Sequence, residues 1–228
     1  QSLFEPKISS RSPNVLLVEL STEIYQNLLE ESRNHDINLI QFGIRRPAIW
    51  NMETFKIIKN SKCGIVTPDS LIDSELKIKI QEQKNLITKQ ISDLYQQDGI
   101  LSKYFSYDGY SFWLAIKPII QKLFEKRIEQ IARDIQTIKA LFQKITIDTA
   151  IISSEIGITE QIVINESKKY GVKLALLQHG VYYDTKEAKE KNLSQGLYPV
   201  KSDKFLIWGK ISENDLKNID IIEPTKLK

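Results

Sequence analysis

The sequence predicts an α/β protein: a doubly wound parallel sheet of about six strands with a long helical-hairpin insertion. Short apolar runs of strand length recur along the chain, and patterns of helical periodicity lie between them. A long, charged stretch with helical spacing interrupts this alternation. Alternating strands and helices favour a parallel sheet, because each parallel pair of strands needs a crossover connection.

The first half of the sheet is predicted from the runs VLLVEL, INLIQF and CGIVT, near residues 15–20, 37–42 and 63–67. The amphipathic stretch TEIYQNLLEESRNH separates the first two runs, and the shorter pattern ETFKIIKNS precedes the third. Pro68 ends the third run, because proline lacks the backbone N–H that a ladder needs. The chain is therefore expected to open as β-α-β-α-β.

Residues 69–144 are predicted to be the helical insertion, with helices near 69–97 and 111–144. Apolar residues of the second helix recur in steps of three and four and form one stripe. They are Ile116, Ile120, Leu123, Ile128, Ile131, Ile135, Ile138 and Phe142. We expect the two helices to pack antiparallel through this stripe, although a coiled-coil dimer could use it instead. The break between them has two Asp-Gly pairs and many aromatic residues, which predicts an ordered loop.

The sheet resumes near 147–153, 173–178 and 204–208, and Gly171 lies where a helix would end in a left-handed conformation. Right-handed crossovers predict the strand order 3-2-1-4-5-6, which is a Rossmann-like layout. Residues 1–12 are expected to be an N-terminal arm, and 13–228 a single domain that carries the insertion.

Composition excludes several classes of protein. One cysteine among 228 residues excludes an internal disulfide, and with two histidines it also excludes a structural zinc site of the Cys/His type. A net charge of +3 argues against a dedicated nucleic-acid binder. Phosphate-binding glycine motifs and metal-spaced clusters are absent from the sequence, so we predict no cofactor and no metal. The sequence has neither a membrane-spanning stretch nor a signal peptide at its start, which predicts a cytoplasmic protein.

Ligands of open parallel sheets bind beyond the carboxyl ends of the strands, so residues that follow strands are the candidates for a site. Those singled out are Arg45 and Arg46 after the second strand, Ser154 and Glu155 after the fourth, and Gln178, His179 and Gly180 after the fifth. This mixture of cations, a carboxylate and an imidazole suits a polar or phosphorylated molecule.

His179 is the candidate general base, because an imidazole titrates near neutral pH. A hydrogen bond to a loop would explain it equally well. Glu155 is expected either to bind substrate hydroxyls and orient His179, or to stabilise a helix as a carboxylate in its first turn.

Arg45 and Arg46 can bind a phosphate or carboxylate in bidentate fashion, or lie unused on the surface. Asp108, in the Y-D-G-Y stretch, is a candidate sugar contact, and a turn aspartate is the alternative.

The last third of the chain resembles a known family. The stretches that carry the likeness are S-S-E-I-G-I-T-E-Q, K-Y-G-V-K-L-A-L-L-Q-H-G-V-Y-Y and K-S-D-K-F-L-I-W-G, between residues 153 and 209. They resemble the N-terminal half of GT-B glycosyltransferases of surface polysaccharide biosynthesis, which include capsule synthesis enzymes and CDP-glycerol glycerophosphotransferases. His179, Gly180 and Asp203 match a His-Gly pair and a later aspartate of that family.

The resemblance implies that His179 is the base or acceptor-orienting group, and that Gly180 lets the backbone pass close to substrate. It also implies a nucleotide-activated donor, bound by a C-terminal domain that this chain does not contain, and a glycan or lipid-linked acceptor. The insertion would then shape contact with the acceptor or with the inner face of the membrane. Two other functions stay open: a non-catalytic module that binds a nucleotide or sugar phosphate, and a structural protein that dimerises through its helices.

Overall fold

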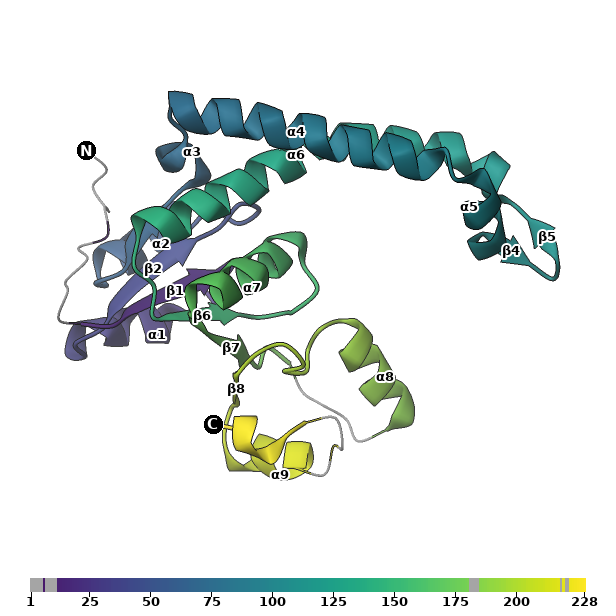
Figure 1. Cartoon of the computed structure of the whole chain (residues 1–228). Helices are drawn as coiled ribbons and strands as arrows, with labels where there is room; N and C mark the ends of the chain where they lie inside the picture. The colour runs from purple at the N-terminus through teal and green to yellow at the C-terminus, as the bar shows by residue number, and fades with distance from the viewer. Residues whose placement is uncertain (1–5, 7–11, 181–184, 218, 220–221) are drawn as a thin grey trace. The chain divides into compact units, whose positions relative to one another are not determined.

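The computed structural model describes residues 6, 12–180, 185–217, 219 and 222–228, and its centre is a six-stranded sheet (Figure 1). The strands are β1 (Asn14–Val18), β2 (Asn38–Phe42), β3 (Gly64–Val66), β6 (Thr149–Ile152), β7 (Lys173–Leu177) and β8 (Lys204–Leu206). They are ordered β3-β2-β1-β6-β7-β8, and every neighbouring pair is parallel. The predicted Rossmann-like fold and strand order are confirmed, while most of the predicted arm at 1–12 lies outside the described residues.

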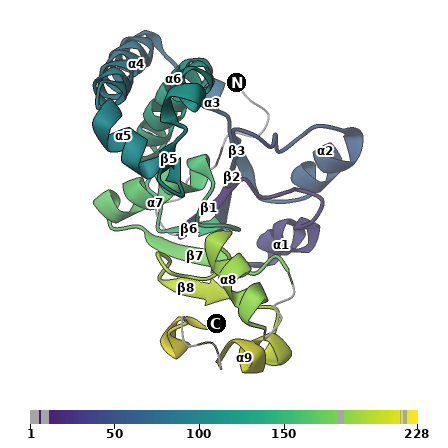
Figure 2. The ribbon, with the colours of Figure 1, turned by 90° about the vertical axis from the view of Figure 1, so that its right-hand side faces the viewer.

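Helices cover both faces of the sheet, as Figures 1 and 2 show. The helices that the chain forms besides those of the long insertion are α1 (Gln26–Glu31), α2 (Met52–Lys59), α3 (Pro68–Leu71), α7 (Ile158–Tyr170), α8 (Lys186–Ser194) and α9 (Lys210–Lys217), of which α8 buries no residue. The pleat sends alternate residues of β1 to opposite faces. Leu16 therefore packs in a core with Val163 of α7, whereas Leu17 packs in a second core with Leu29 of α1 and Ile58 of α2.

Cys63 lies in this second core just before β3. Burial raises the pKa of its thiol to about 12, although a hydrogen bond with the backbone of Gln41 acts in the opposite direction. The thiol is therefore neutral at physiological pH and serves as a small apolar side chain.

The chain separates into two compact units, one of residues 1–71 and 138–228 and the other of Ile72–Thr137. Helix α6 (Trp113–Lys144) continues across the boundary. Ile138, Leu141 and Phe142 from its last turns belong to the core of the first unit. The compact second unit is therefore shorter than the predicted insertion at 69–144, and the final turns of α6 pack in the core of the sheet.

The body of the second unit is an antiparallel pair made by α4 (Ser74–Tyr95) and the part of α6 up to Thr137. An amide hydrogen bond of 3.0 Å joins Gln136 to Gln83, and the rings of Tyr95 and Trp113 lie 6.2 Å apart near the other end. The predicted antiparallel packing is therefore confirmed, but the predicted stripe is only partly buried, because Leu123 is 60% exposed.

The aromatic segment between the long helices folds into α5 (Asp98–Tyr104) and a hairpin of β4 (Ser106–Tyr107) and β5 (Tyr110–Ser111). Asp108 and Gly109 form its turn with φ of 50° and 80°. Positive φ at both central residues is the mark of the type I′ turn, which matches the twist of a hairpin. The expected ordered loop is thus a small helix and a hairpin.

Candidate functional site

A pocket of about 920 Å³ lies at the carboxyl edge of the sheet in the first unit. Its walls come from residues that follow β1, β2, β6, β7 and β8, together with the start of α7. This is the edge at which ligands of open parallel sheets bind. Five of the eight residues singled out from the sequence line the pocket, namely Arg45, Arg46, Ser154, Gln178 and His179.

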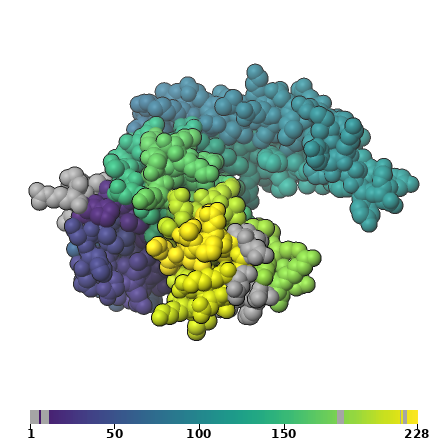
Figure 3. Space-filling model, turned by 60° about the horizontal axis from the view of Figure 1, so that its bottom comes forward, coloured from purple at the N-terminus to yellow at the C-terminus, as the bar shows by residue number. Residues whose placement is uncertain are grey.

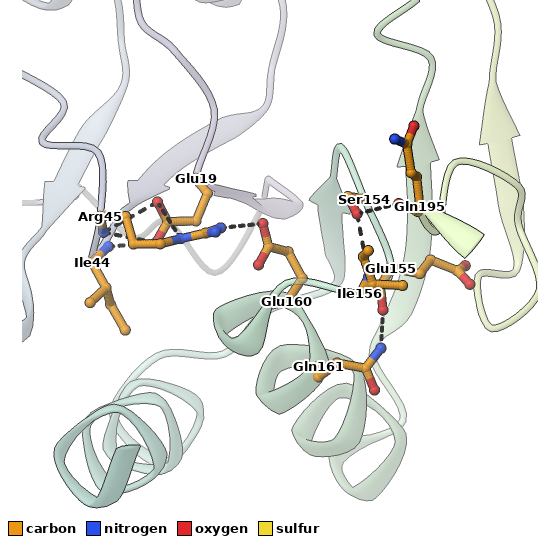
Figure 4. Close-up of polar contacts among 9 residues, drawn as sticks. All are labelled: Glu19, Ile44, Arg45, Ser154, Glu155, Ile156, Glu160, Gln161 and Gln195. Atoms are coloured by element: carbon orange, nitrogen blue, oxygen red, sulfur yellow. Dashed lines mark hydrogen bonds and ion pairs between the residues drawn. The ribbon is translucent and has the colours of Figure 1, made fainter. Parts of the chain in front are cut away.

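Glu19, which the sequence did not single out, lies on the wall of this pocket directly after β1. The backbone of Glu19 has a φ of 55°, which is uncommon for a residue other than glycine. Glu19 is also buried, with 2% of its surface exposed. One carboxylate oxygen accepts hydrogen bonds from the backbone N–H groups of Ile44, at 2.7 Å, and Arg45, at 3.1 Å (Figure 4). Glu19 therefore ties the end of β1 to the loop that follows β2.

Arg45 links Glu19 to a second buried carboxylate, that of Glu160 in the first turn of α7 (Figure 4). Its Nη2 lies 2.6 Å from Oε1 of Glu160, and its Nε lies 3.8 Å from Oε2 of Glu19. The guanidinium predicted to bind an anion is thus already paired within the protein, although half of the side chain is exposed. Arg45 serves here as the bridge between two carboxylates.

The position of Glu160 depends on Gly157, the N-cap of α7. A Cβ on Gly157 would lie 1.9 Å from Oε2 of Glu160, so any other residue at this position would require the carboxylate to move. Oε2 is buried without a hydrogen-bond partner among the described residues. Such an acceptor is costly to bury, which makes Glu160 a constrained element of the pocket wall.

Arg46 lies on the pocket wall next to Tyr25. Burial raises the pKa of the Tyr25 hydroxyl, and the positive charge of Arg46 offsets part of that rise. Arg46 is an exposed residue and, unlike Arg45, forms no ion pair with a carboxylate among the described residues, so it is the arginine that is better able to meet a ligand.

Gln178 holds together the loops that follow β7 and β8. Its side-chain oxygen accepts from the backbone N–H of Trp208 at 2.9 Å, and its side-chain nitrogen donates to the carbonyl of Gly180 at 2.9 Å. The indole N–H of Trp208 donates to the Gln178 carbonyl at the same distance. Gln178 is 2% exposed, so its part is to position the backbone on either side of His179.

His179 is exposed and lines the pocket, which agrees with the predicted location at the sheet edge. Ser154 lines the same pocket, and its hydroxyl donates to the carbonyl of Gln195 at 3.0 Å. At Gly180 a Cβ would meet no atom within 4 Å, so the described chain itself does not require glycine there. The catalytic role of His179 stays a prediction.

Glu155 points to a loop and is not on the pocket wall. It precedes α7, is 3% exposed, and accepts hydrogen bonds from the backbone N–H groups of Lys201 and Ser202 and from the Ser202 hydroxyl, at 2.6–3.1 Å. Its carbonyl accepts from the side-chain amide of Gln161 (Figure 4). In this conformation the carboxylate fixes the loop at 201–202, and the predicted role in catalysis has no supporting contact.

Asp108 belongs to the second unit, where it occupies the turn between β4 and β5. It is not among the residues that line the pocket of the first unit. This geometry agrees with the alternative that Asp108 is a turn aspartate. A contact between Asp108 and a sugar stays a prediction.

Sequence reasoning missed Glu19, Glu160 and Tyr25 as residues of the site. The sequence does contain a signal for Glu19, which directly follows four apolar strand residues. A carboxylate at such a position must either point out of the core or receive hydrogen bonds or a cation within it. Glu160 carried no comparable signal, since an acidic residue in the first turn of a helix is ordinary.

Within the described part of the chain, no three histidine, cysteine, aspartate or glutamate residues are grouped closely enough to hold a metal ion. Among these same residues, no helix combines the length and the apolar character that crossing a membrane requires. Comparison of the sequence with models of known protein families and with curated proteins gave no significant match.

Proposed function

We propose that this chain is the acceptor-side domain of a glycosyltransferase-like enzyme. The enzyme transfers a sugar or a polyol phosphate from a nucleotide donor to a surface polysaccharide acceptor, and a separate domain binds the donor. The observation that carries the proposal is the pocket at the carboxyl edge of the sheet, with His179 on its wall. The resemblance of residues 153–209 to GT-B enzymes supplies the reaction class.

In this proposal, His179 is the general base that removes a proton from an acceptor hydroxyl. The imidazole takes the proton while the oxygen attacks the anomeric carbon, or the phosphorus of a polyol phosphate, and the nucleotide leaves with the electron pair. The Gln178 network supports this role, because it fixes the loops beside an otherwise exposed ring. Arg46 is better placed than Arg45 to meet an anionic group, because Arg45 is paired with Glu160.

Replacing His179 by alanine in the enzyme that includes the donor domain tests the proposal. General base catalysis contributes roughly 10² to 10⁴ in rate, so turnover should fall by about that factor. The melting temperature should hardly change, since the side chain is exposed. The matched control is His35→Ala, because His35 is the other histidine of the chain, is exposed, and does not line the pocket. Unchanged transfer by His179→Ala would overturn the assignment.

The contact made by Glu155 favours the second candidate function, a non-catalytic module that binds a nucleotide or a sugar phosphate. A base normally has an orienting group, and the predicted one is instead bound to the loop at 201–202. Proton NMR of the two histidine rings separates the candidates when a nucleoside diphosphate or an acceptor sugar is added. A His179 signal that responds to the acceptor sugar supports the enzyme, whereas a response to the nucleotide alone supports the binding module.

A further inference from the structure

The hairpin end of the second unit and the adjoining first turns of α6 carry several exposed aromatic and apolar side chains, which together we call the aromatic tip. It consists of Tyr104, Tyr107, Tyr110, Phe112, Ile119 and Leu123. The three tyrosines are 80–82% exposed, and the two aliphatic residues are each 60% exposed. Scattered apolar residues are normal on a surface, but six within the twenty residues from Tyr104 to Leu123 require an explanation.

The aromatic tip is held in place by packing beneath it. Phe105 stacks on Trp113 with ring centroids 5.1 Å apart, and the indole N–H of Trp113 donates to Asp98 at 2.7 Å. Trp113 is 1% exposed, so it acts as the core of this end of the unit. The exposed tyrosines therefore stand on an ordered support.

The hairpin presents two of the tyrosines together. Tyr107 and Tyr110 are directly paired across β4 and β5, so their side chains lie on the same face of the hairpin. The space-filling view shows this end of the second unit, in teal, as a narrow convex protrusion (Figure 3).

Basic residues accompany the apolar ones along the start of α6. Ile119, Lys122, Leu123 and Lys126 follow the spacing i, i+3, i+4, i+7, so they share one exposed face of the helix. Between Lys103 and Arg127 the chain has five basic residues and two acidic ones, Asp108 and Glu125, and one of the five, Lys117, is paired with Asp98 at 2.8 Å. Lysines among exposed apolar residues can extend their ammonium groups past a buried stem, as they do at membrane interfaces.

We propose that the aromatic tip docks on the surface of a membrane that contains anionic lipids. Tyrosine prefers the headgroup region, where its ring is in apolar surroundings and its hydroxyl is in water. Ile119, Leu123 and Phe112 would enter the outer part of the acyl layer, and the neighbouring lysines would meet lipid phosphates. The unit would lie on the membrane without crossing it. This inference does not depend on the proposed transferase activity.

Vesicle binding by the 228-residue chain tests it. Flotation with phosphatidylcholine vesicles that contain an equal part of phosphatidylglycerol should recover the protein, and vesicles of phosphatidylcholine alone should recover much less. Tyr104→Ser, Tyr107→Ser and Tyr110→Ser together should weaken binding by about tenfold or more. The matched control combines Met52→Ser, Val200→Ser and Ile211→Ser, which are exposed apolar residues of the first unit, and it should bind as the parent does.

A second set of variants guards against misfolding and identifies the lipid charge. Lys122→Glu with Lys126→Glu should abolish the preference for phosphatidylglycerol and leave the melting temperature unchanged. Tyr107→Trp should show fluorescence quenching by lipids brominated near the headgroup. Equal vesicle binding by the tyrosine variant and the parent, or no binding by either, overturns the proposal. The proposal would also be overturned if the parent were a dimer, the tyrosine variant a monomer, and neither bound vesicles. The aromatic tip would then be a surface for self-association.

Discussion

Glu19 combines three properties that are each unfavourable alone: positive φ, burial and negative charge. They are tolerated because the carboxylate accepts the backbone N–H groups of Ile44 and Arg45 and lies close to the Arg45 guanidinium. Strained conformations that persist in a folded chain are concentrated at functional sites. Glu19 thus places a strained backbone conformation on the wall of the pocket.

Glu19→Ala should lower the free energy of unfolding by about 2–4 kcal/mol, because two buried N–H groups lose their acceptor and Arg45 loses part of its pairing. Urea denaturation followed by circular dichroism measures this change. Glu53→Ala, at an exposed glutamate in the first turn of α2, is the control and should shift stability by no more than about 0.5 kcal/mol. A similar small shift for both variants would contradict the structural role given to Glu19.

At the scale of single elements, Gly171 shows how backbone geometry selects a residue. It ends α7 with φ of 67°, and its N–H donates to the carbonyl of Ser167. A Cβ at this position would meet no atom within 4 Å, so only the conformation, and not space, requires glycine. The sequence predicted this left-handed end correctly.

Gly171→Ala should therefore lower stability by about 1 kcal/mol, through the cost of a left-handed conformation. Gly171→Asn should cost less, because asparagine visits this region more readily. Thermal unfolding of the two variants makes the comparison, and equal losses for alanine and asparagine would show that something besides backbone conformation acts at this position.

The elements that the sequence predicted well have a regular spacing of apolar residues or a residue that clearly marks where the element ends. The six strands were found because their apolar runs are short and bounded, and parallel order followed from the crossovers. Helix α8 was missed because its sequence, KEAKEKNLS, has no apolar face, and its start is marked only by the Thr185 cap. The single predicted helix at 69–97 is divided, since Asp73 caps α4 after the short α3.

The candidate site was predicted only in part, for a related reason. Strand ends can be located from periodicity, which is how the sequence analysis found Arg45, Arg46, Ser154, Gln178 and His179. Which way a side chain turns from a strand end depends on partners distant in the sequence. The turn of Glu155 toward Ser202 was therefore not predictable from local pattern.

At the scale of the whole molecule, the two units differ in how much core they have. The first has a large buried cluster on one face of the sheet and a second on the other. Buried apolar residues of the second unit are few, among them Leu76, Tyr95, Trp113 and Ile128. Local stability follows the amount of buried apolar contact.

Hydrogen exchange measured by mass spectrometry should therefore show the slowest exchange in β1, β6 and β7. Peptides from 74–95 and from the first half of α6 should exchange faster, by about one to three orders of magnitude, because their hydrogen bonds open locally. The last turns of α6, which contain Ile138 and Leu141, should be as slow as the sheet. Uniform protection along the whole of α6 would contradict this division.

The two strands that pair with β1 lie on opposite sides of the second unit in the sequence, so the ribosome makes one of them well before the other. Val15 pairs with Leu39 of β2 on one side and with Thr149 of β6 on the other. At about 5–20 residues per second, translation takes on the order of 10 s to proceed from β3 to β6. During that interval the nascent chain has one unpaired edge on its central strand, a template for pairing with other chains. Protection by a chaperone is needed most in that interval, before Ile152 has left the exit tunnel.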